Sequence, residues 1–445
     1  MIHPLHRRYS ALVLILLFAL GLALPAARPA YAIGALTVTT LADNTDPNDG
    51  KCSLREALQA AFNEATYQNC AGAGASPNII TFGIPGVIKL TSGSALTGIH
   101  NNVGLVGPIT IDGNASDRIF NVSASGTLSL GLVTLMNGKV SGGGGAILSA
   151  GGSINIAGSS FIGNQADNNG GVIDSTGSIN IVGSNFSGNK ATGNGGAIHI
   201  TGGDVSLTLA GSNFAGNIAT GSGGAISVSA GADISDVIFS GNIATGDATN
   251  GGGAIFNGAA SGGSKLTLLR SSFNGNLSPQ GNGGALFNGS QAIALVSDSS
   301  FNGNIAGTPI ANNRFGGAIY NQSQSQLALN RVTMLTNAVG GSGGALANDK
   351  GTAIVTNTSF TANAASSKGG GVFNFDSQQG GANTSTVTLR NVTFSSNAAL
   401  ISGGGINNDS ANDPLAVVTI SNTIIDNSDG AGLGGNCVGT IISAG

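Results

Sequence analysis

The sequence predicts an all-β protein, a right-handed single-stranded parallel β-helix with an N-terminal capping helix. Two observations predict this fold: a Gly-Gly-Ala-Ile-like tetrad recurs ten times, and a Phe-x-x-Asn-like tetrad follows it each time. The length of the unit varies, but the spacing from the aromatic anchor to the Asn does not. A fixed local spacing inside a variable period is typical of stacked coils joined by loops of different length.

Residues 1–32 have the pattern of a secretory signal peptide. His6, Arg7 and Arg8 form a basic start, residues 11–24 are apolar, and Ala30-Tyr31-Ala32 is a small-x-small cleavage site. The sequence therefore predicts an exported protein that is secreted or held at the cell surface. The formal charge of −4 becomes more negative once the basic signal is removed, so nucleic acid is not an expected partner.

Residues 33–75 are predicted to form the N-terminal cap. Residues 36–40 alternate like a strand, and Ser53 with Glu56 three residues later has the pattern of a capping box. A helix is predicted to follow and to cover the open edge of the first coil. Its apolar stripe has helical spacing and consists of Leu54, Ala57, Leu58, Ala61 and Phe62.

The three cysteines lead to two expectations. Cys52 and Cys70 flank the predicted helix, and since export permits disulfides, these two are expected to pair. Cys437 has no partner in the chain, so the natural protein is expected to continue beyond Gly445.

Residues 76–445 are predicted to form the β-helix, with repeats clearest over residues 141–430. Short alternating runs such as Ser153-Ile154-Asn155-Ile156 favour strands. The anchor is predicted to fill the core by stacking on the next coil, and the Asn to sit in a turn with a left-handed backbone. The anchors are Phe161, Phe186, Phe214, Phe239, Phe273, Phe301, Met334, Phe360, Phe394 and Ile424. The asparagines are Asn164, Asn189, Asn217, Asn242, Asn276, Asn304, Asn337, Asn363, Asn397 and Asn427.

These motifs resemble two known families. Cys52-Ser53-Leu54-Arg55-Glu56-Ala57 resembles the CSLREA domain, an N-terminal segment of secreted bacterial β-helix proteins. The Gly-Gly-Ala-Ile and Phe-x-x-Asn pair is similar to the repeats of the polymorphic outer-membrane protein family. That resemblance implies a pectate-lyase-like solenoid at the cell surface, with adhesins among its relatives. Members usually end in a membrane β-barrel, and this chain has none, so a membrane is expected as a partner only through an anchor outside the chain.

A β-helix enzyme is the alternative interpretation, namely a polysaccharide lyase or glycoside hydrolase that acts on an acidic polysaccharide. The chain lacks the Asp-Asp, Gly-His-Gly and Arg-x-Lys motifs of polygalacturonase-like hydrolases, and no Glu follows Glu64. Asp residues on neighbouring coils could still supply paired carboxylates. His199 is predicted to be an exposed strand residue.

One set of charges could carry such chemistry. The residues three positions before four successive anchors alternate in sign, and strand alternation predicts that they share one outer face. A surface row of ion pairs is favoured over a carbohydrate site in which Arg acts as base or sugar clamp. The residues, called the charge ladder below, are Asp236, Arg270, Asp298 and Arg331.

No cofactor or metal is predicted. The acidic loop over residues 43–50 suggests calcium, but as an EF-hand its first and third ligands would be Thr45 and Pro47, so a turn with Asx hydrogen bonds is favoured. The predicted function is a structural or adhesive surface role without catalysis. The expected partners are cell-surface glycans or proteins, in contact with the long loops that hold Asn250, Asn313, Gln379 and Asp409.

Overall fold

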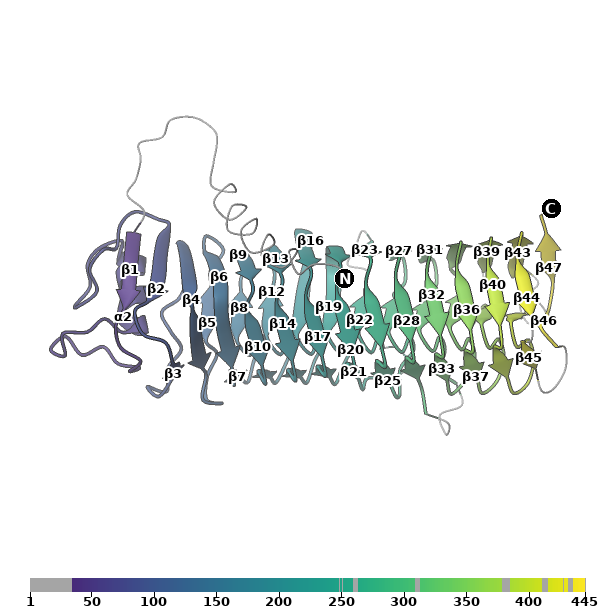
Figure 1. The fold of residues 1–445 in the computed structure, drawn as a ribbon, viewed down its shortest axis with the longest axis horizontal. Coiled ribbons are helices and arrows are strands. Elements are labelled where there is room, and N and C mark those ends of the chain that lie inside the picture. Colours follow the sequence, from purple (N-terminus) through teal and green to yellow (C-terminus); the bar gives the residue numbers. More distant parts are fainter. Residues whose placement is uncertain are drawn as a thin grey trace, which may run out of the picture.

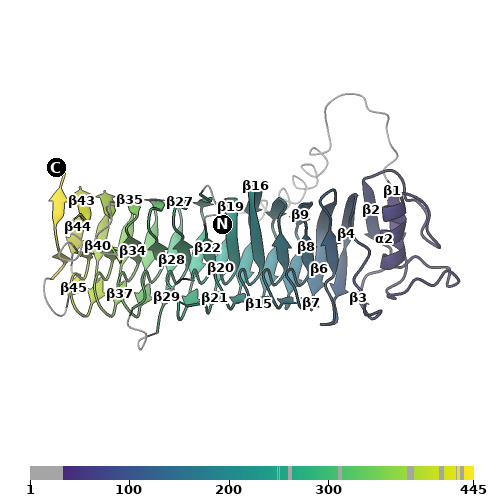
Figure 2. The same cartoon turned by 180° about the vertical axis from the view of Figure 1, so that it is seen from behind.

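The computed structural model of the protein is a parallel β-solenoid that forms a long rod (Figure 1), and Figure 2 shows it from behind. This confirms the predicted all-β parallel β-helix. The structure describes residues 34–445 except 248, 250, 259–262, 309–312, 378–384, 410–414, 427, 431–434 and 445. The predicted signal peptide and Asn427 lie outside the described residues. Within the described part, no helix is both long and apolar enough to cross a membrane.

A complete coil contributes strands to four faces of the rod. Face I contains the strands that follow the glycine tetrads, face II the next strands, face III the Phe-x-x-Asn strands, and face IV two-residue strands. Four long strands continue from one face into the next, so faces I to III form one 36-stranded sheet, and face IV is an 11-stranded sheet. These long strands are β4 (Asn102–Asp112), β6 (Thr127–Met136), β16 (Ile198–Ala210) and β19 (Ile226–Ser235).

The remaining strands fall into four series. Face I holds β5 (Phe120–Val122), β8 (Ile147–Ser149), β12 (Ile173–Ser175), β22 (Ile255–Asn257), β26 (Leu286–Asn288), β30 (Ile319–Asn321), β34 (Leu346–Asp349), β38 (Val372–Phe375), β42 (Ile406–Asn408) and β46 (Cys437–Val438). Face II holds β1 (Gly34–Val38), β2 (Asn78–Phe82), β9 (Ser153–Ala157), β13 (Ile179–Val182), β23 (Lys265–Leu269), β27 (Ile293–Ser297), β31 (Gln326–Asn330), β35 (Thr352–Thr356), β39 (Thr386–Arg390), β43 (Val417–Ser421) and β47 (Ile441–Ser443). Face III holds β3 (Val87–Lys89), β10 (Ser160–Ile162), β14 (Asn185–Ser187), β17 (Asn213–Ala215), β20 (Ile238–Ser240), β24 (Ser272–Asn274), β28 (Ser300–Asn302), β32 (Thr333–Leu335), β36 (Ser359–Thr361), β40 (Thr393–Ser395) and β44 (Ile424–Asp426). Face IV holds β7 (Lys139–Val140), β11 (Gln165–Ala166), β15 (Lys190–Ala191), β18 (Ile218–Ala219), β21 (Ile243–Ala244), β25 (Leu277–Ser278), β29 (Ile305–Ala306), β33 (Ala338–Val339), β37 (Ala364–Ala365), β41 (Ala398–Ala399) and β45 (Asp429–Gly430).

A stack of phenylalanine rings runs through the core. Phe161, Phe186 and Phe214 are fully buried, and their ring centroids lie 4.6 and 4.5 Å apart. Met334 takes the register position between Phe301 and Phe360. The tenth anchor was predicted one residue too early: Ile425 pairs in register with Phe394, whereas Ile424 is 64% exposed. The last coil therefore keeps its core side chain although its sequence departs from the motif.

The asparagines form a hydrogen-bonded ladder inside the rod, called the inner asparagine ladder. Each side-chain amide donates to the anchor carbonyl of the preceding coil and to Oδ1 of the next Asn, as Asn276 does to Phe239 and Asn304 at 3.1 and 2.9 Å. The ladder ends where Ser428 accepts from the backbone N–H of Asn397. The left-handed residue is the one before the Asn, for example Gly275 with φ of 59°, and not the Asn itself as predicted. The ladder is Asn164, Asn189, Asn217, Asn242, Asn276, Asn304, Asn337, Asn363 and Asn397.

The glycine tetrads bring backbones of successive coils close together. Gly195 has φ of 67°, a conformation that a side chain disfavours. A Cβ on Gly196 would lie 2.1 Å from the carbonyl oxygen of Gly224 in the next coil. The tetrad therefore has no room for a side chain at its second position.

A second buried asparagine ladder, on face I, was missed at the sequence level. Asn257 donates to Oδ1 of Asn288 at 2.8 Å, and the pattern continues to the next coils. A signal was present, because six tetrads are followed by one residue and then Asn. The ladder is Asn257, Asn288, Asn321, Asn348, Asn374 and Asn408.

At the N-terminal end, α2 (Leu54–Asn63) packs against β1. Ser53 and Glu56 form the capping box, because each side chain accepts from the backbone N–H of the other. Leu54, Ala57, Leu58 and Ala61 are buried as the stripe predicted. Phe62 is not, since it is 45% exposed and forms a T-shaped contact with the ring of His100 instead.

Candidate functional site

The charge ladder lies in the turns that connect face II to face III. The backbone N–H of each residue donates to the next coil, as Asp236 does to Leu269 at 3.0 Å, so the four turns stack on successive coils. All four residues have positive φ, between 46° and 57°. Arg270 donates from Nε and Nη2 to Asp236 at 2.7 Å each, and Arg331 donates to Asp298 at 2.6 and 2.8 Å. The ladder thus contains two bidentate ion pairs.

The electrostatics of these pairs favour permanent charge. Hydrogen bonds from Arg270 lower the pKa of Asp236, and hydrogen bonds from Arg331 lower the pKa of Asp298. In return, the hydrogen bond to Asp236 raises the pKa of Arg270. Proton transfer near neutral pH requires a pKa close to neutrality, so these shifts suit an ion pair better than a general acid or base.

Asparagines continue the same row of turns beyond Arg331. Asn391 donates from Nδ2 to Oδ1 of Asn357 at 3.1 Å, and Asn422 donates to Asn391 at 2.6 Å. Their φ values are also positive, at 51° for Asn357 and 53° for Asn391. Asn and Asp tolerate this backbone better than other side chains. The outer corner of the rod is therefore lined with paired polar side chains.

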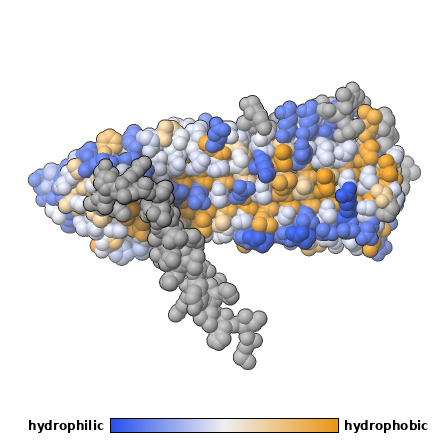
Figure 3. Space-filling view, turned by 90° about the horizontal axis from the view of Figure 1, so that it is seen from above, coloured by the Kyte–Doolittle hydropathy of each residue, from blue (hydrophilic) through white to orange (hydrophobic). Residues whose placement is uncertain are grey.

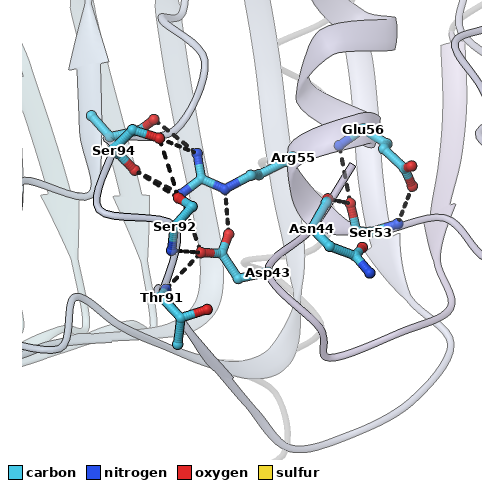
Figure 4. Close-up of polar contacts among 9 residues, drawn as sticks. Asp43, Asn44, Ser53, Arg55, Glu56, Thr91, Ser92 and Ser94 are labelled. Atoms are coloured by element: carbon cyan, nitrogen blue, oxygen red, sulfur yellow. Dashed lines mark hydrogen bonds and ion pairs between the residues drawn. The ribbon is translucent and has the colours of Figure 1, made fainter. Parts of the chain in front are cut away.

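Each residue of the Cys52–Ala57 hexapeptide has a distinct structural contact. Cys52 forms a disulfide with Cys70, and Ala57 is fully buried beside the core. Figure 4 shows Arg55, whose guanidinium is paired with Asp43 and donates to the carbonyl oxygens of Ser94 and Ala95 at 2.6 and 2.9 Å. The helix and the loop over residues 91–95 are thereby held together.

Asp43 is the centre of this contact. Its Oδ2 accepts from the backbone N–H of Thr91 and Ser92 at 2.6 and 3.0 Å. Burial raises the pKa of the carboxyl, but the hydrogen bonds from Arg55, Thr91 and Ser92 outweigh burial and leave that pKa below its ordinary value. Figure 4 shows Arg55, Thr91 and Ser92 around Asp43.

The acidic loop over residues 43–50 is arranged by Asx hydrogen bonds. Asp46 Oδ1 accepts from the backbone N–H of Asn48 at 2.9 Å, and Asp49 Oδ1 accepts from Lys51 at 2.8 Å. Asp43 is instead paired with Arg55 (Figure 4). Among the described residues, no three His, Cys, Asp or Glu side chains gather in a way that could hold a metal ion.

His199 was predicted to be exposed, but its side chain is only 12% exposed. Its Nδ1 lies 2.7 Å from Oδ1 of Asp174, which occupies the same register position on the preceding coil. Arg118 donates to the carbonyl oxygens of Gly143 and Gly144 at 2.8 and 2.9 Å; burial lowers the pKa of its guanidinium, and the charges of Asp117 and Asp174 offset part of that shift. The sequence did not reveal this contact, because the length of the coil decides which residue of the preceding coil lies beside His199.

A second cluster that the sequence did not reveal covers the outer side of face I. Phe287, Tyr320, Phe373 and Phe375 are buried there outside the main core. Tyr320 donates to Asp349 at 2.6 Å, and burial raises its pKa well above the ordinary value. Lys350 and Asp376, both almost fully buried, form an ion pair at 3.1 Å. The polar groups of the cluster are therefore paired with one another and buried.

The long loops that were predicted to contact a partner are only partly described. Asn250 and Gln379 lie outside the described residues. Asn313 is exposed, and Asp409 forms an ion pair with Lys368 at 3.2 Å. These two residues follow different faces, Asn313 after face IV and Asp409 after face I. Both segments border face I, and Lys368, the partner of Asp409, lies between face IV and face I as Asn313 does.

The outer side of face II has a mixed character. Figure 3 looks onto the upper edge of the rod in Figure 1, where β27, β31 and β39 lie, and an orange band runs along part of it between blue margins. Leu295, Ala328 and Ile354 are in register on successive strands and alternate outward from the buried positions. The charge ladder and the exposed asparagines border this face.

Comparison with known proteins supports the type of repeat. Residues 183–201, 236–258 and 298–322 match the family model of the Chlamydia polymorphic membrane protein repeat. The second and third segments begin at Asp236 and Asp298, and each extends through a glycine tetrad into a strand of face I. No curated protein and no solved structure matches the chain at a significant level.

Proposed function

We propose that this protein is an exported, surface-displayed β-solenoid with a structural or adhesive role and no catalytic activity. The observation that carries the proposal is that three coils match a repeat whose family description names membrane proteins. Residues 1–32 act as the signal peptide in this proposal. The winding is right-handed, because parallel crossover connections almost always are.

The physical basis is a rigid rod with tolerant surfaces. The stacked phenylalanines and the inner asparagine ladder fix each coil, while outer side chains and loops can change without disturbing that core. In the proposal, α2 with the Cys52–Cys70 disulfide serves as the N-terminal cap, which covers an edge that would otherwise pair with other chains. The partners are cell-surface glycans or proteins, and neither a cofactor nor a metal is required.

A panel of glycans, polysaccharides and cells tests this function. The purified chain is assayed on each for binding and, by release of reducing or unsaturated ends, for bond cleavage. Binding without cleavage supports the adhesive role. Cleavage that disappears when Arg270 and Arg331 are both replaced by Gln would overturn the proposal and favour the lyase alternative.

A matched control is available on the same corner of the rod. Asn357→Gln and Asn391→Gln alter neighbouring turns without changing the charge of the ladder. Loss of activity in the arginine variant but not in the asparagine variant would assign the chemistry to the ladder. Loss in both would point to a general change in the shape of the corner.

A further inference from the structure

Face IV carries an apolar ridge next to an apolar hollow along its outer row. The row takes one outward side chain from each two-residue strand, and the strands are in register from coil to coil. Ile243, Leu277 and Ile305 are bulky and form the ridge, which Ile218 continues on the strand before them. Ala338, Ala364 and Ala398 follow on the next three strands and leave the hollow. The face lies along the lower edge of the rod in Figures 1 and 2.

The hollow is a surface depression lined mainly by apolar residues. Its volume is about 360 Å³, with Ile305 at one end and Leu400 at the other. Gly307 and Gly340 beside the alanines keep its floor low. Ile305 is 41% exposed and Leu400 is 66% exposed, so both rims project into the solvent. Contiguous exposed apolar patches larger than roughly a few hundred Å² mark interaction sites, and the ridge and the hollow form one continuous apolar row.

We infer that the occupant of the hollow is the ridge of a second copy of this chain, packed antiparallel across a two-fold axis between β29 and β33. Such an axis places three strands of ridge opposite three strands of hollow, and the reverse on the other side. Ile305 then faces Ala338 of the other copy, and Leu277 faces Ala364. The spacing matches without adjustment, because both surfaces have the same strand repeat of ~4.8 Å. A self-complementary patch is what a two-fold dimer requires.

The charges at the two ends of face IV agree with the antiparallel arrangement. Lys139 and Lys190 project from its first strands, and Asp429 projects from its last. The proposed axis places β45 of one copy opposite β18 of the other, so Asp429 lies opposite Ile218 and one strand from Lys190 of β15, which is within side-chain reach across the interface. A parallel arrangement would instead place like charges beside one another, which is unfavourable.

The contact is small, so the dimer is expected to be weak. Eight strands at ~4.8 Å and a width of about 12 Å give roughly 400 Å² per copy, below the area of a standard stable interface. Small interfaces are typical of weak, transient complexes, so we expect a dissociation constant above ~1 μM. Molecules held on one surface have a high effective concentration, which would favour such pairing.

Sedimentation over a concentration series tests the interface. The purified chain is expected to pass from monomer to dimer as its concentration rises to ~500 μM. Ala364→Arg fills the hollow with a charge and should raise the dissociation constant at least ~10-fold. Thr361→Arg, which adds the same charge on face III of the same coil, should leave it unchanged. Circular dichroism of both variants checks that the fold is intact.

Crosslinking tests the orientation. In a Cys437→Ser background, Ile243→Cys and Ala398→Cys are prepared as separate proteins and treated with a short bis-maleimide. In the proposed dimer each position lies opposite the other, but about 24 Å from its own counterpart, which is five strand spacings. A crosslink should therefore form in the mixture and in neither protein alone.

Several outcomes would overturn the inference. These are a monomer at every concentration, dimerisation that survives Ala364→Arg, or a crosslink in either cysteine variant by itself. The inference goes beyond the proposed surface role. The dimer can be disproved while the surface role still holds, because monomeric Ala364→Arg protein can be assayed for binding to glycans and cells.

Discussion

Arg270 donates two hydrogen bonds of 2.7 Å to Asp236 of the preceding coil, while both residues keep a left-handed backbone with φ of 46° and 57°. A left-handed backbone is unfavourable for an arginine. The bidentate pair offsets part of that cost in a solvent-exposed turn, where an ion pair alone contributes little.

Substitutions at Arg270 should therefore rank by backbone preference and not by charge. Arg270→Gly should leave the thermal midpoint unchanged or raise it, because Gly adopts positive φ freely. Arg270→Val should lower it, since a β-branched side chain is most strained there. Both variants lose the ion pair equally, so each is the control for the other. Equal midpoints measured by circular dichroism would contradict this account of the corner.

The register of the core predicts a sharp contrast between two neighbours. Phe273→Ala should destabilise the protein by roughly 3–5 kcal/mol, because it removes a fully buried ring from the stack. Asn274→Ala should change the free energy of unfolding by no more than ~0.5 kcal/mol, because Asn274 points outward. The measurement is denaturant unfolding of the two variants, and similar midpoints would refute the assigned register.

The inner asparagine ladder should be as sensitive as the phenylalanine stack. Asn276→Ala leaves the anchor carbonyl of Phe239 and the backbone N–H of Asn242 without their partners, which should cost several times the ~1 kcal/mol of one hydrogen bond. Asn274→Ala is the matched control, because it removes the same side chain outside the ladder. Comparable stabilities in thermal unfolding would show that the ladder is dispensable.

The contact between Asp43 and Arg55 predicts that the stability of the N-terminal segment depends on pH. The pKa of Asp43 is lower in the folded state than its ordinary value of about 4. The ionised carboxylate therefore stabilises the fold at pH values above about 4, and this stabilisation is lost as the pH falls below that value. Hydrogen exchange of the α2 amides should therefore accelerate at low pH, after correction for the intrinsic rate. Asp43→Asn should show less of this change; an identical pH profile would exclude Asp43 as the cause.

The Cys52–Cys70 disulfide predicts the redox sensitivity of the N-terminal segment. Its two cysteines are 18 residues apart, and closing a loop of this length typically contributes about 3 kcal/mol. Replacing both by Ala should raise hydrogen exchange in α2 and β1 while β24 and β28 stay protected. Peptide mapping of protein recovered after export provides the direct check, and two free thiols would contradict the pairing.

Local spacing in the sequence was sufficient to predict the solenoid. Phe273 and Asn276 are three residues apart in a motif that repeats, and strand alternation alone separates inward from outward positions. The capping box at Ser53 and Glu56 was likewise readable, because both partners lie within one helical turn. The sequence was weakest where the motif decays, and the anchor of the last coil was placed at Ile424 instead of Ile425.

Only the tertiary structure decided which side chains meet between coils. Asp174 faces His199, Asp43 pairs with Arg55, and Tyr320 donates to Asp349, and none of these contacts has a fixed sequence spacing. The sequence by itself determined the coil, since its motifs act over three to five residues. Stacking determined the surface, because loops of different length bring residues 25 to 34 positions apart into register, and no local pattern records that distance.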